Sequence, residues 1–346
     1  MEPTIQLARD KSAHDVVLVG SLDYYFNPVT EAVAAKGYNV VRYNTPADFV
    51  AKTDALDNAS VLYAVGYCPV SRAAMARAPH LRAVISPWTG TEGFDERAAS
   101  DLGIIIGNGQ VPENTDSMAE ATVLMILACL YDFNTTQQRF LTQDVWAVPQ
   151  LTARQLGGKT IGLLGYGGIA RGVVARLAAW GVAFRATTRH PPVENPHGVS
   201  FLPLEDMLAA SDIVCVLAPL TDETRGMLGA ARLQLMKRGS VLICTSRGGI
   251  IDEEALVKLS HEGHFNAVGL DVFEKEPLPK DSPLRGLKNA VLTPHSIGLT
   301  REMRVKSVEA SIANVLRVLE GEPPLYIRNP QILKTWRARW AIERPS

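Results

Sequence analysis

The chain has 346 residues, of which 47% are hydrophobic and 21% charged, and its formal net charge at pH 7 is −1. This length favours two domains, and the composition is typical of globular rather than disordered proteins. A nearly neutral chain gives no reason to expect nucleic acid or an anionic membrane as a partner. The most apolar helical stretch, 118–130, contains Glu120 and is shorter than the ~20 residues of a membrane span.

The N-terminal residues and the cysteines give no indication of a secreted protein. Residues 1–14 are mixed and polar and lack the apolar core of a signal peptide. The four cysteines lie far apart, and neither a disulfide framework nor a metal-ligand spacing is present: Cys68, Cys129, Cys215 and Cys244. We therefore expect reduced thiols, no metal site and a soluble, cytoplasmic protein.

Short β-branched runs alternate with helical patterns along the first third of the chain. Helical segments such as Val29–Lys36 and Ser71–Ala78 separate the expected strands. A long helix then begins near Asp116 or Ser117 and continues to about Asp132. The alternation predicts a parallel sheet with helices on both faces. The strands are expected at Val16–Gly20, Asn39–Tyr43, Val61–Gly66, Ala83–Ser86 and Ile104–Gly107.

A second series of strands follows, and most of its members are apolar throughout, as in strands buried on both faces. They are expected at Thr160–Gly165, Ala183–Thr188, Ile213–Ala218, Ser240–Thr245, Ala267–Val272 and Ala290–Thr293. Two such series predict two α/β domains. The last helix, from Thr300 to about Leu319, has no strand after it and can pack on either domain. Beyond Pro330 lies a tail with Trp336 and Trp340, for which surface packing is the simplest interpretation.

A glycine-rich turn lies between the first strand of the second series and a helix at Ile169–Trp180. Gly165 permits the tight turn, Gly167 lets the backbone approach a pyrophosphate, and Ala170 takes the third position, where close helix–strand packing favours a small residue. The helix N-terminus offers free N–H groups to phosphates. Placement between strand and helix makes this turn a predicted dinucleotide site.

The next strand ends at Thr187, Thr188, Arg189 and His190, about 20 residues after the glycines. An NAD site normally has an acidic residue there, and none is present. Thr188 can donate a hydrogen bond to a 2′-phosphate, and Arg189 can pair with it. We therefore expect NADP(H) in preference to NAD(H); the alternative is that Arg189 is a solvated surface charge.

Three segments at the carboxyl ends of later strands carry the residues that reduction of a 2-keto acid requires. Arg247, between Ser246 and Gly248, can bind the substrate carboxylate and polarise the ketone. His295 can donate the proton as hydride arrives and take it back in the reverse direction. A neighbouring carboxylate would stabilise the protonated histidine. Spacing alone leaves this carboxylate open between Glu274 and Glu276.

These segments, together with 156–160 and 218–224, resemble the D-isomer-specific 2-hydroxyacid dehydrogenases from Val16 to Pro330. The resemblance implies that Arg247 binds substrate, Glu276 is the partner of the histidine and His295 is the acid/base. The turn Thr187–His190 is most similar to the NADP-preferring glyoxylate/hydroxypyruvate reductase branch. The implied cofactor contacts are Gly165, Tyr166, Gly167, Gly168, Ile169, Thr188, Arg189, His190, Ala218, Pro219, Thr245, Ser246 and Asp271, the last at the nicotinamide carboxamide.

The resemblance also implies an architecture of two Rossmann- or flavodoxin-like doubly wound domains. A discontinuous substrate domain would comprise residues 1–115 and 299–330, a cofactor domain 116–298, and a C-terminal tail 331–346. Homodimerisation is expected through the region from the long helix to Trp146. The implied substrate contacts are Gly66, Tyr67, Trp88, Gly90 and Thr91, with the carboxylate on the N–H groups of Gly90 and Thr91.

Two other functions remain open. One is a nucleotide-sensing corepressor that keeps this fold and site but acts through partner contacts. The other is a 3-phosphoglycerate-type dehydrogenase, for which Arg72 is the nearby candidate to bind a substrate phosphate.

Overall fold

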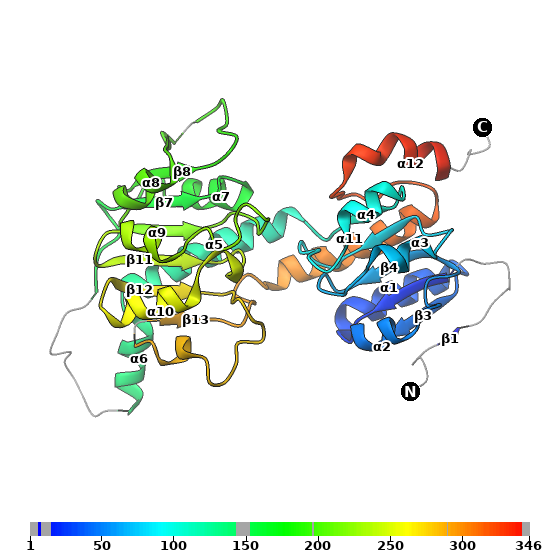
Figure 1. Ribbon diagram of the computed structural model, residues 1–346, viewed down its shortest axis with the longest axis horizontal. Helices are drawn as coiled ribbons and strands as arrows, with labels where there is room; N and C mark the ends of the chain where they lie inside the picture. The colour runs from blue at the N-terminus through cyan, green and yellow to red at the C-terminus, as the bar shows by residue number, and fades with distance from the viewer. Residues whose placement is uncertain (1–5, 8–14, 143–152, 196, 289, 341–346) are drawn as a thin grey trace. The chain divides into compact units, whose positions relative to one another are not determined.

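The computed structural model describes residues 6–7, 15–142, 153–195, 197–288 and 290–340. The chain divides into two compact units. The first comprises Met1–Glu113 and Arg301–Ser346, and the second comprises Asn114–Thr300. Each unit is built around its own sheet (Figure 1). The chain therefore enters and leaves the second unit once.

The first unit contains a six-stranded sheet in the order β1-β3-β2-β4-β5-β6. Its strands are β1 (Gln6–Leu7), β2 (Asp15–Val19), β3 (Val40–Tyr43), β4 (Ala59–Ala64), β5 (Ala83–Ile85) and β6 (Ile105–Gly107). Strands β2 to β6 pair in parallel, whereas β1, which the sequence did not predict, pairs antiparallel with β3. The order reverses between β2 and β4, which is the switch point of a flavodoxin-like sheet.

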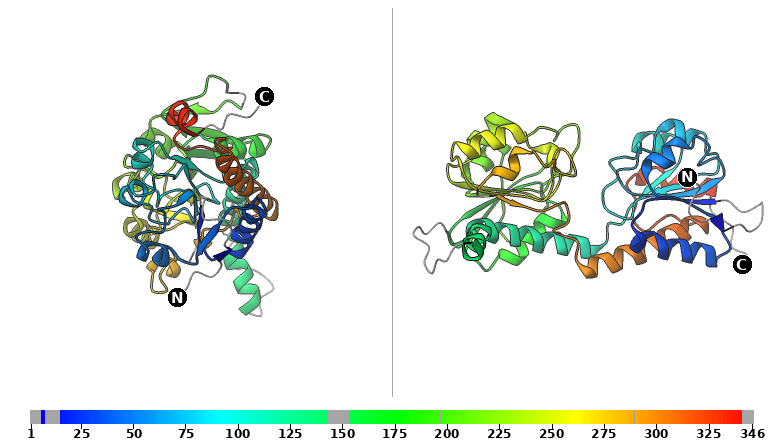
Figure 2. Two further views of the ribbon diagram at one scale, coloured as in Figure 1. Left: turned by 90° about the vertical axis from the view of Figure 1, so that its right-hand side faces the viewer. Right: turned by 90° about the horizontal axis from the view of Figure 1, so that it is seen from below.

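Helices cover both faces of this sheet. They are α1 (Asp23–Ala35), α2 (Pro46–Ala51), α3 (Arg72–Ala76), α4 (Glu96–Asp101) and α11 (Arg301–Leu319). Helices α1 and α11 lie side by side on one face, and α2, α3 and α4 lie on the other (Figure 2). The side chains of Thr45, Ser71 and Asp95 cap α2, α3 and α4 by accepting hydrogen bonds from first-turn N–H groups.

The segment after Pro330 packs into the first unit rather than forming a separate tail. Helix α12 (Leu333–Trp340) places Trp336 in the core with 1% of its surface exposed. The indole Nε1–H of Trp336 donates to the carbonyl oxygen of Arg82 at 2.8 Å. A large apolar ring with a satisfied donor is a strong anchor, and it explains why this helix joins the core.

The second unit contains a seven-stranded parallel sheet in the order β13-β12-β11-β10-β7-β8-β9. Its strands are β7 (Thr160–Leu164), β8 (Ala183–Thr187), β9 (Ser200–Phe201), β10 (Ile213–Val216), β11 (Ser240–Cys244), β12 (Phe265–Leu270) and β13 (Ala290–Leu292). This is the Rossmann order, with its switch point between β7 and β10. The structure confirms the predicted fold class of two doubly wound α/β sheets.

Each face of the second sheet has its own apolar core. In β10, Ile213 and Cys215 join one cluster, whereas Val214 and Val216 join the other. The all-apolar sequence of the strand follows from this alternation, because both faces are buried. On one face lie α5 (Pro112–Leu130) and α7 (Gly168–Leu177); on the other lie α8 (Leu204–Ala210), α9 (Ala230–Leu235) and α10 (Glu253–His261) (Figure 2).

Helix α5 begins at Pro112, four residues before the predicted start at Asp116. Proline is favoured at the first helical position because its missing N–H would have no partner there and its φ is already helical. Within the described residues, no helix combines the length and the apolar character that a membrane span requires.

Candidate active site

Polar side chains follow three neighbouring strands of the second unit. Arg247 follows β11, Asp271 follows β12 directly, and His295 follows β13. These strands are adjacent and parallel, so their carboxyl ends meet at one edge of the sheet. Open α/β sheets bind their ligands at such an edge. This edge is the candidate active site.

His295 and Glu276 form the central pair of the site. Nδ1 of His295 lies 2.7 Å from Oε2 of Glu276, and the two side chains are 43% and 35% exposed. Oε1 of Glu276 accepts a hydrogen bond from the N–H of Phe273 at 3.0 Å. Glu276 therefore orients the imidazole through Nδ1 and leaves Nε2 for proton exchange.

Glu276 is held in its ionised form. Burial alone would raise its pKa, but the hydrogen bonds from His295 and Phe273 lower the pKa below its usual value. The positive charges of His295 and Arg247 act in the same direction. The carboxylate is thus available to stabilise a protonated imidazole across the neutral pH range.

Asp271 holds the loop that carries His295. It is 1% exposed, and its backbone carbonyl accepts a hydrogen bond from the N–H of His295 at 2.7 Å. Its Oδ1 accepts hydrogen bonds from the Thr293 hydroxyl at 2.7 Å, the Ser296 N–H at 2.9 Å and the Ile297 N–H at 3.2 Å. Burial raises the pKa of Asp271, and these hydrogen bonds oppose the rise. Among the described residues, none donates to its Oδ2, which remains open to a ligand.

Arg247 is half-buried at the end of β11, next to the 3-10 turn Gly248–Ile250. Its Nη1 donates to the carbonyl oxygen of Ser246 at 2.6 Å. A Cβ at Gly248 would lie 2.0 Å from the carbonyl carbon of Phe273, so only glycine allows this close approach. The contact brings the Arg247 segment against the loop that leads to Glu276.

The glycine turn between β7 and α7 has the features that a dinucleotide requires. Gly165 adopts φ +94°, and a Cβ there would lie 2.7 Å from the backbone nitrogen of Ala218. Gly167 precedes α7, and a Cβ there would meet nothing within 4 Å, which leaves open space above the turn. Ala170 is fully buried, as the third position of the motif requires. The turn therefore fits a pyrophosphate at the N-terminus of α7.

The predicted cofactor residues after β8 and β11 lie at the same edge of the sheet. Arg189 is exposed, and its Nη1 donates to Oε2 of Glu223 at 3.0 Å. Thr188 is half-buried beside it, and His190 is exposed. After β11, the hydroxyl oxygens of Thr245 and Thr122 lie 3.1 Å apart, which joins this turn to α5.

The predicted substrate residues lie on two loops of the first unit, after β4 and β5. The N–H of Gly93 donates to the carbonyl oxygen of Gly66 at 2.8 Å, so the loops contact each other. Thr91 is 8% exposed, whereas Tyr67 is 65% exposed. Across the described residues, the N–H groups of Tyr67, Gly90 and Thr91 donate to no protein acceptor. Such a group of unpaired donors can bind a carboxylate.

Comparison with known proteins identifies the family. A profile described as the D-isomer specific 2-hydroxyacid dehydrogenase NAD binding domain matches residues 123–296. The chain is also 35% identical over 270 residues to a glyoxylate reductase from Aeropyrum pernix, a match that covers 75% of this chain and 80% of that relative. The chain belongs to the D-isomer-specific 2-hydroxyacid dehydrogenases.

Other members of this family agree with the assignment. Glyoxylate/hydroxypyruvate reductase B from Citrobacter koseri is 30% identical, over 76% of this chain and 82% of its own length. A solved NADPH-dependent glyoxylate/hydroxypyruvate reductase from Sinorhizobium meliloti, in complex with NADP and malonate, has a TM-score of 0.82 and 25% sequence identity. That match covers 96% of this chain and 100% of the solved chain.

The sequence analysis of this 2-hydroxyacid dehydrogenase missed the role of Glu223. It lies in the 218–224 segment that supported the resemblance, but its pairing with Arg189 joins loops 34 residues apart in the sequence. The pair places a carboxylate beside Arg189, although the segment 187–190 itself contains no acidic residue. The signal available in the sequence was Glu223 itself, an acidic residue in the segment that follows another strand of the same sheet.

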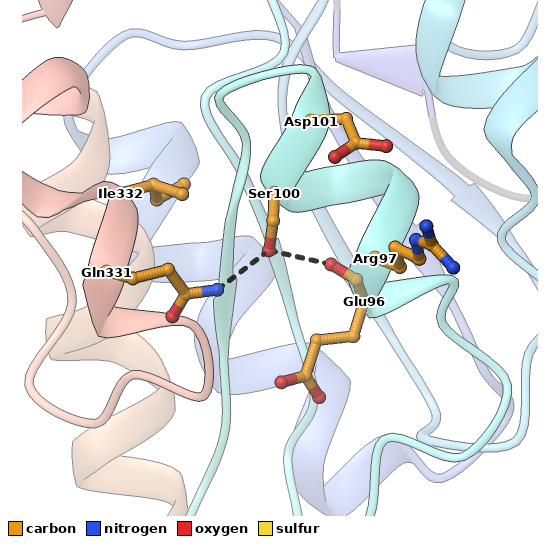
Figure 3. A pocket seen from close by; sticks show the side chains of 6 residues that line it. All are labelled: Glu96, Arg97, Ser100, Asp101, Gln331 and Ile332. Carbon is orange, nitrogen blue, oxygen red and sulfur yellow. Dashed lines mark hydrogen bonds between the residues drawn. The ribbon is translucent and has the colours of Figure 1, made fainter.

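A surface pocket of about 600 Å³ lies elsewhere in the first unit, between α4 and the segment before α12 (Figure 3). None of the predicted site residues lines it. It is lined by Glu96, Arg97, Ser100, Asp101, Gln331 and Ile332. Asp101 pairs with Arg72, the residue considered for binding a substrate phosphate, and Glu96 pairs with Arg328 at 3.7 Å. Both acidic side chains of this pocket therefore have a cationic partner on the surface.

Proposed function

We propose that the protein reduces 2-keto acids of the glyoxylate and hydroxypyruvate type to D-2-hydroxy acids with a nicotinamide cofactor. The observation that carries this proposal is the His295–Glu276 pair at 2.7 Å, which lies at the carboxyl edge of the sheet next to Arg247. The relatives named glyoxylate reductase support the substrate class.

A reduced nicotinamide held by the second unit would supply the hydride for the carbonyl carbon of the substrate. Protonated His295 donates its Nε2 proton to the carbonyl oxygen, which yields the hydroxyl group. Glu276 stabilises the protonated imidazole before transfer, and Arg247 binds the substrate carboxylate and polarises the carbonyl. In the oxidation direction, neutral His295 accepts the hydroxyl proton.

The residues of the second unit fit a dinucleotide. The open space above Gly167 and the free N–H groups of the first turn of α7 suit a pyrophosphate. Thr245, Ser246 and Asp271 lie at neighbouring strand ends and would contact the nicotinamide part. In this proposal, the substrate carboxylate also contacts the N–H groups of Gly90 and Thr91.

We propose NADP(H) as the preferred cofactor, with Arg189 at the 2′-phosphate. The ion pair with Glu223 modifies this preference, because the 2′-phosphate must compete with a carboxylate for Arg189. Both side chains of the pair are about 70% exposed, at 70% and 69%. An exposed pair of this kind is worth only ~0–1 kcal/mol, so a phosphate can displace Glu223 from Arg189.

We also propose a homodimer. Helix α6 (Phe133–Thr142) has no buried residue, and it exposes 57% of Phe133, 75% of Phe140 and 67% of Leu141. Exposed aromatic and aliphatic side chains on one helix indicate a protein–protein interface. The expected interface extends to Trp146, which lies outside the described residues. Sedimentation equilibrium, which gives the molecular mass in solution, tests this assignment.

The reaction is tested by initial rates of NADPH and NADH oxidation with glyoxylate, hydroxypyruvate, pyruvate and 3-phenylpyruvate. We expect turnover with NADPH, and His295→Ala should lower kcat about 10²–10⁴-fold while cofactor binding is retained. Near-normal turnover of His295→Ala would refute the acid/base role. Tight cofactor binding without turnover of any keto acid would favour the corepressor-like function instead.

The described residues of the first unit do not support the 3-phosphoglycerate alternative. Its candidate cation, Arg72, is paired with Asp101 on the surface and lines no pocket described above. Oxidation of 3-phosphoglycerate in the same assay would restore that alternative.

A further inference from the structure

Aromatic side chains gather at the carboxyl ends of three strands in the first unit. Tyr24 and Tyr25 lie at the start of α1, just after β2, while Tyr67 follows β4 and Trp88 follows β5. Strands β2, β4 and β5 are neighbours in the sheet, and the strand order reverses between β2 and β4. This group, which we call the aromatic array, therefore lies at the switch point, where such sheets bind ligands.

The rings of the array form a continuous series. Tyr24 meets Tyr25 edge-on with ring centroids 5.6 Å apart, and Tyr25 meets Trp88 edge-on at 5.9 Å. Tyr67 stacks on Trp88 at 6.4 Å with 25° between the ring planes. The rings at the two ends of this series are more exposed than Tyr25: Tyr25 is 5% exposed, Tyr24 41% and Tyr67 65%. A buried ring thus anchors a group whose outer rings are more exposed, with the Arg304 guanidinium lying 4.0 Å from the centroid of the Tyr24 ring.

The loops that present these rings are fixed by hydrogen bonds. Arg42, which is 5% exposed, donates to the carbonyl oxygen of Gly20 at 3.0 Å and to Asp23 at 3.0 Å, which fixes the loop before Tyr24. The N–H of Trp88 donates to the Ser86 hydroxyl at 3.2 Å, and its carbonyl accepts from Gly109 at 2.9 Å. The rings are therefore preorganised for a ligand, which reduces the entropy cost of binding.

The same loops carry the unpaired N–H donors described above. The backbone donors of Tyr67, Gly90 and Thr91 lie within three residues of an array ring in the sequence. A Cβ on Gly66 would lie 2.0 Å from the carbonyl oxygen of Gly90, which shows how closely the two loops approach. A ligand that satisfies both features has a carboxylate for the N–H groups and a flat apolar group for the rings.

We propose that the aromatic array recognises the side chain of the substrate, so that 2-keto acids with an aromatic side chain undergo the proposed reaction with a higher kcat/KM than small ones such as glyoxylate and pyruvate. The proposal deepens the proposed function and rests on it. Glyoxylate carries only hydrogen at this position and would leave the rings in contact with water. Stacking or edge-on contact of one aromatic group with two rings favours it by about tenfold or more over a methyl group.

The first measurement compares 3-phenylpyruvate with pyruvate, which differ by one phenyl group. With NADPH, we expect kcat/KM for 3-phenylpyruvate to exceed that for pyruvate by at least about tenfold. Tyr67→Leu and Trp88→Leu should each lower this ratio by about five- to tenfold. Tyr67→Leu is the cleaner variant because its ring is largely exposed. Trp180→Leu is the matched control, since Trp180 is 48% exposed in the second unit and outside the array, and its ratio should stay at the wild-type value.

A binding measurement separates failure of this inference from failure of the proposed reaction. Isothermal titration calorimetry of the NADP⁺-loaded protein gives the Kd of 3-phenylpyruvate and of pyruvate without turnover. Tighter binding of 3-phenylpyruvate that Tyr67→Leu abolishes supports the array, even if no keto acid is reduced. Equal Kd values overturn the array, as does a kcat/KM ratio of one or less, and turnover of pyruvate or glyoxylate would still uphold the reaction.

Discussion

Glu276→Gln removes the negative charge beside His295 while keeping the size of the side chain. Two unit charges about 4 Å apart interact by about 4 kcal/mol at an effective dielectric constant near 20, which is the scale of an ion pair such as this one. Both side chains are more than a third exposed, at 43% and 35%, so solvent screening reduces this to ~1 kcal/mol. A shift of one pH unit corresponds to about 1.4 kcal/mol. The substitution should therefore move the pH profile by about one unit.

The direction of the shift follows from the proton that is transferred. Reduction needs protonated His295, which the carboxylate of Glu276 stabilises. In Glu276→Gln, the decline of kcat/KM for keto acid reduction should therefore begin about one pH unit lower than in the wild type. Glu276→Asp keeps the charge and is the control, which should retain most of the wild-type profile. Identical profiles for wild type and Glu276→Gln would refute the electrostatic role of Glu276.

The same substitution has a signed effect on stability. The pKa of Glu276 in the folded protein is lower than its usual value, so the carboxylate stabilises the fold at pH values above the usual pKa of glutamate. This contribution is lost as the pH falls through the lowered pKa. The Tm difference between wild type and Glu276→Gln should therefore be present near neutral pH and disappear under strongly acidic conditions. A difference that grows with acidity would contradict this reasoning.

Four further substitutions test other parts of the molecule. Arg247→Lys should not retain the wild-type KM and kcat, because a lysine cannot form the planar two-point contact that an arginine forms with a carboxylate. Full activity of this variant would exclude that contact. Arg189→Ala should weaken NADPH binding about tenfold or more with little effect on NADH, whereas Glu223→Gln should strengthen NADPH binding up to about fivefold. Equal effects on both cofactors, measured as Kd by fluorescence titration, would exclude a role at the 2′-phosphate. Phe140→Glu should lower the mass measured by sedimentation to that of a monomer, and an unchanged dimer would place the interface elsewhere.

The parts of the fold that sequence could predict are those set by local chemistry. The apolar run of β10 and the strand–turn–helix around Gly165 follow from burial on both faces and from backbone geometry. The placement of Arg247 and His295 at one edge follows from parallel strands in a sheet. The early start of α5 at Pro112 and the docking of Trp336 were missed. The first depends on a helix-end rule, and the second depends on a contact with Arg82, 254 residues away.

The sequence left the carboxylate partner of His295 undecided, because two glutamates lie close together. Glu274 and Glu276 are two positions apart, and spacing alone did not distinguish them. In the structure, Oε2 of Glu276 lies 2.7 Å from Nδ1 of His295, whereas the backbone N–H of Glu274 donates to Oε1 of Glu253 at 2.6 Å. The distinction arises from the turn after β12, where the N–H of Phe273 fixes the carboxylate of Glu276. Long-range and turn-dependent contacts of this kind leave no periodic signal in the sequence.

Two ion pairs at the same edge of the second sheet differ in how strongly the fold determines them. The loop that carries His295 is held by Asp271. This carboxylate is 1% exposed and accepts three hydrogen bonds from the loop. The Arg189–Glu223 pair has no such support and is about 70% exposed on both sides, at 70% and 69%. Replacing Asp271 would cost the buried hydrogen bonds that hold the His295 loop, whereas disturbing the Arg189–Glu223 pair costs ~1 kcal/mol or less. The loop that carries the proposed acid/base residue is thus anchored on a buried carboxylate, whereas the residue proposed to set the cofactor preference is held by a surface ion pair.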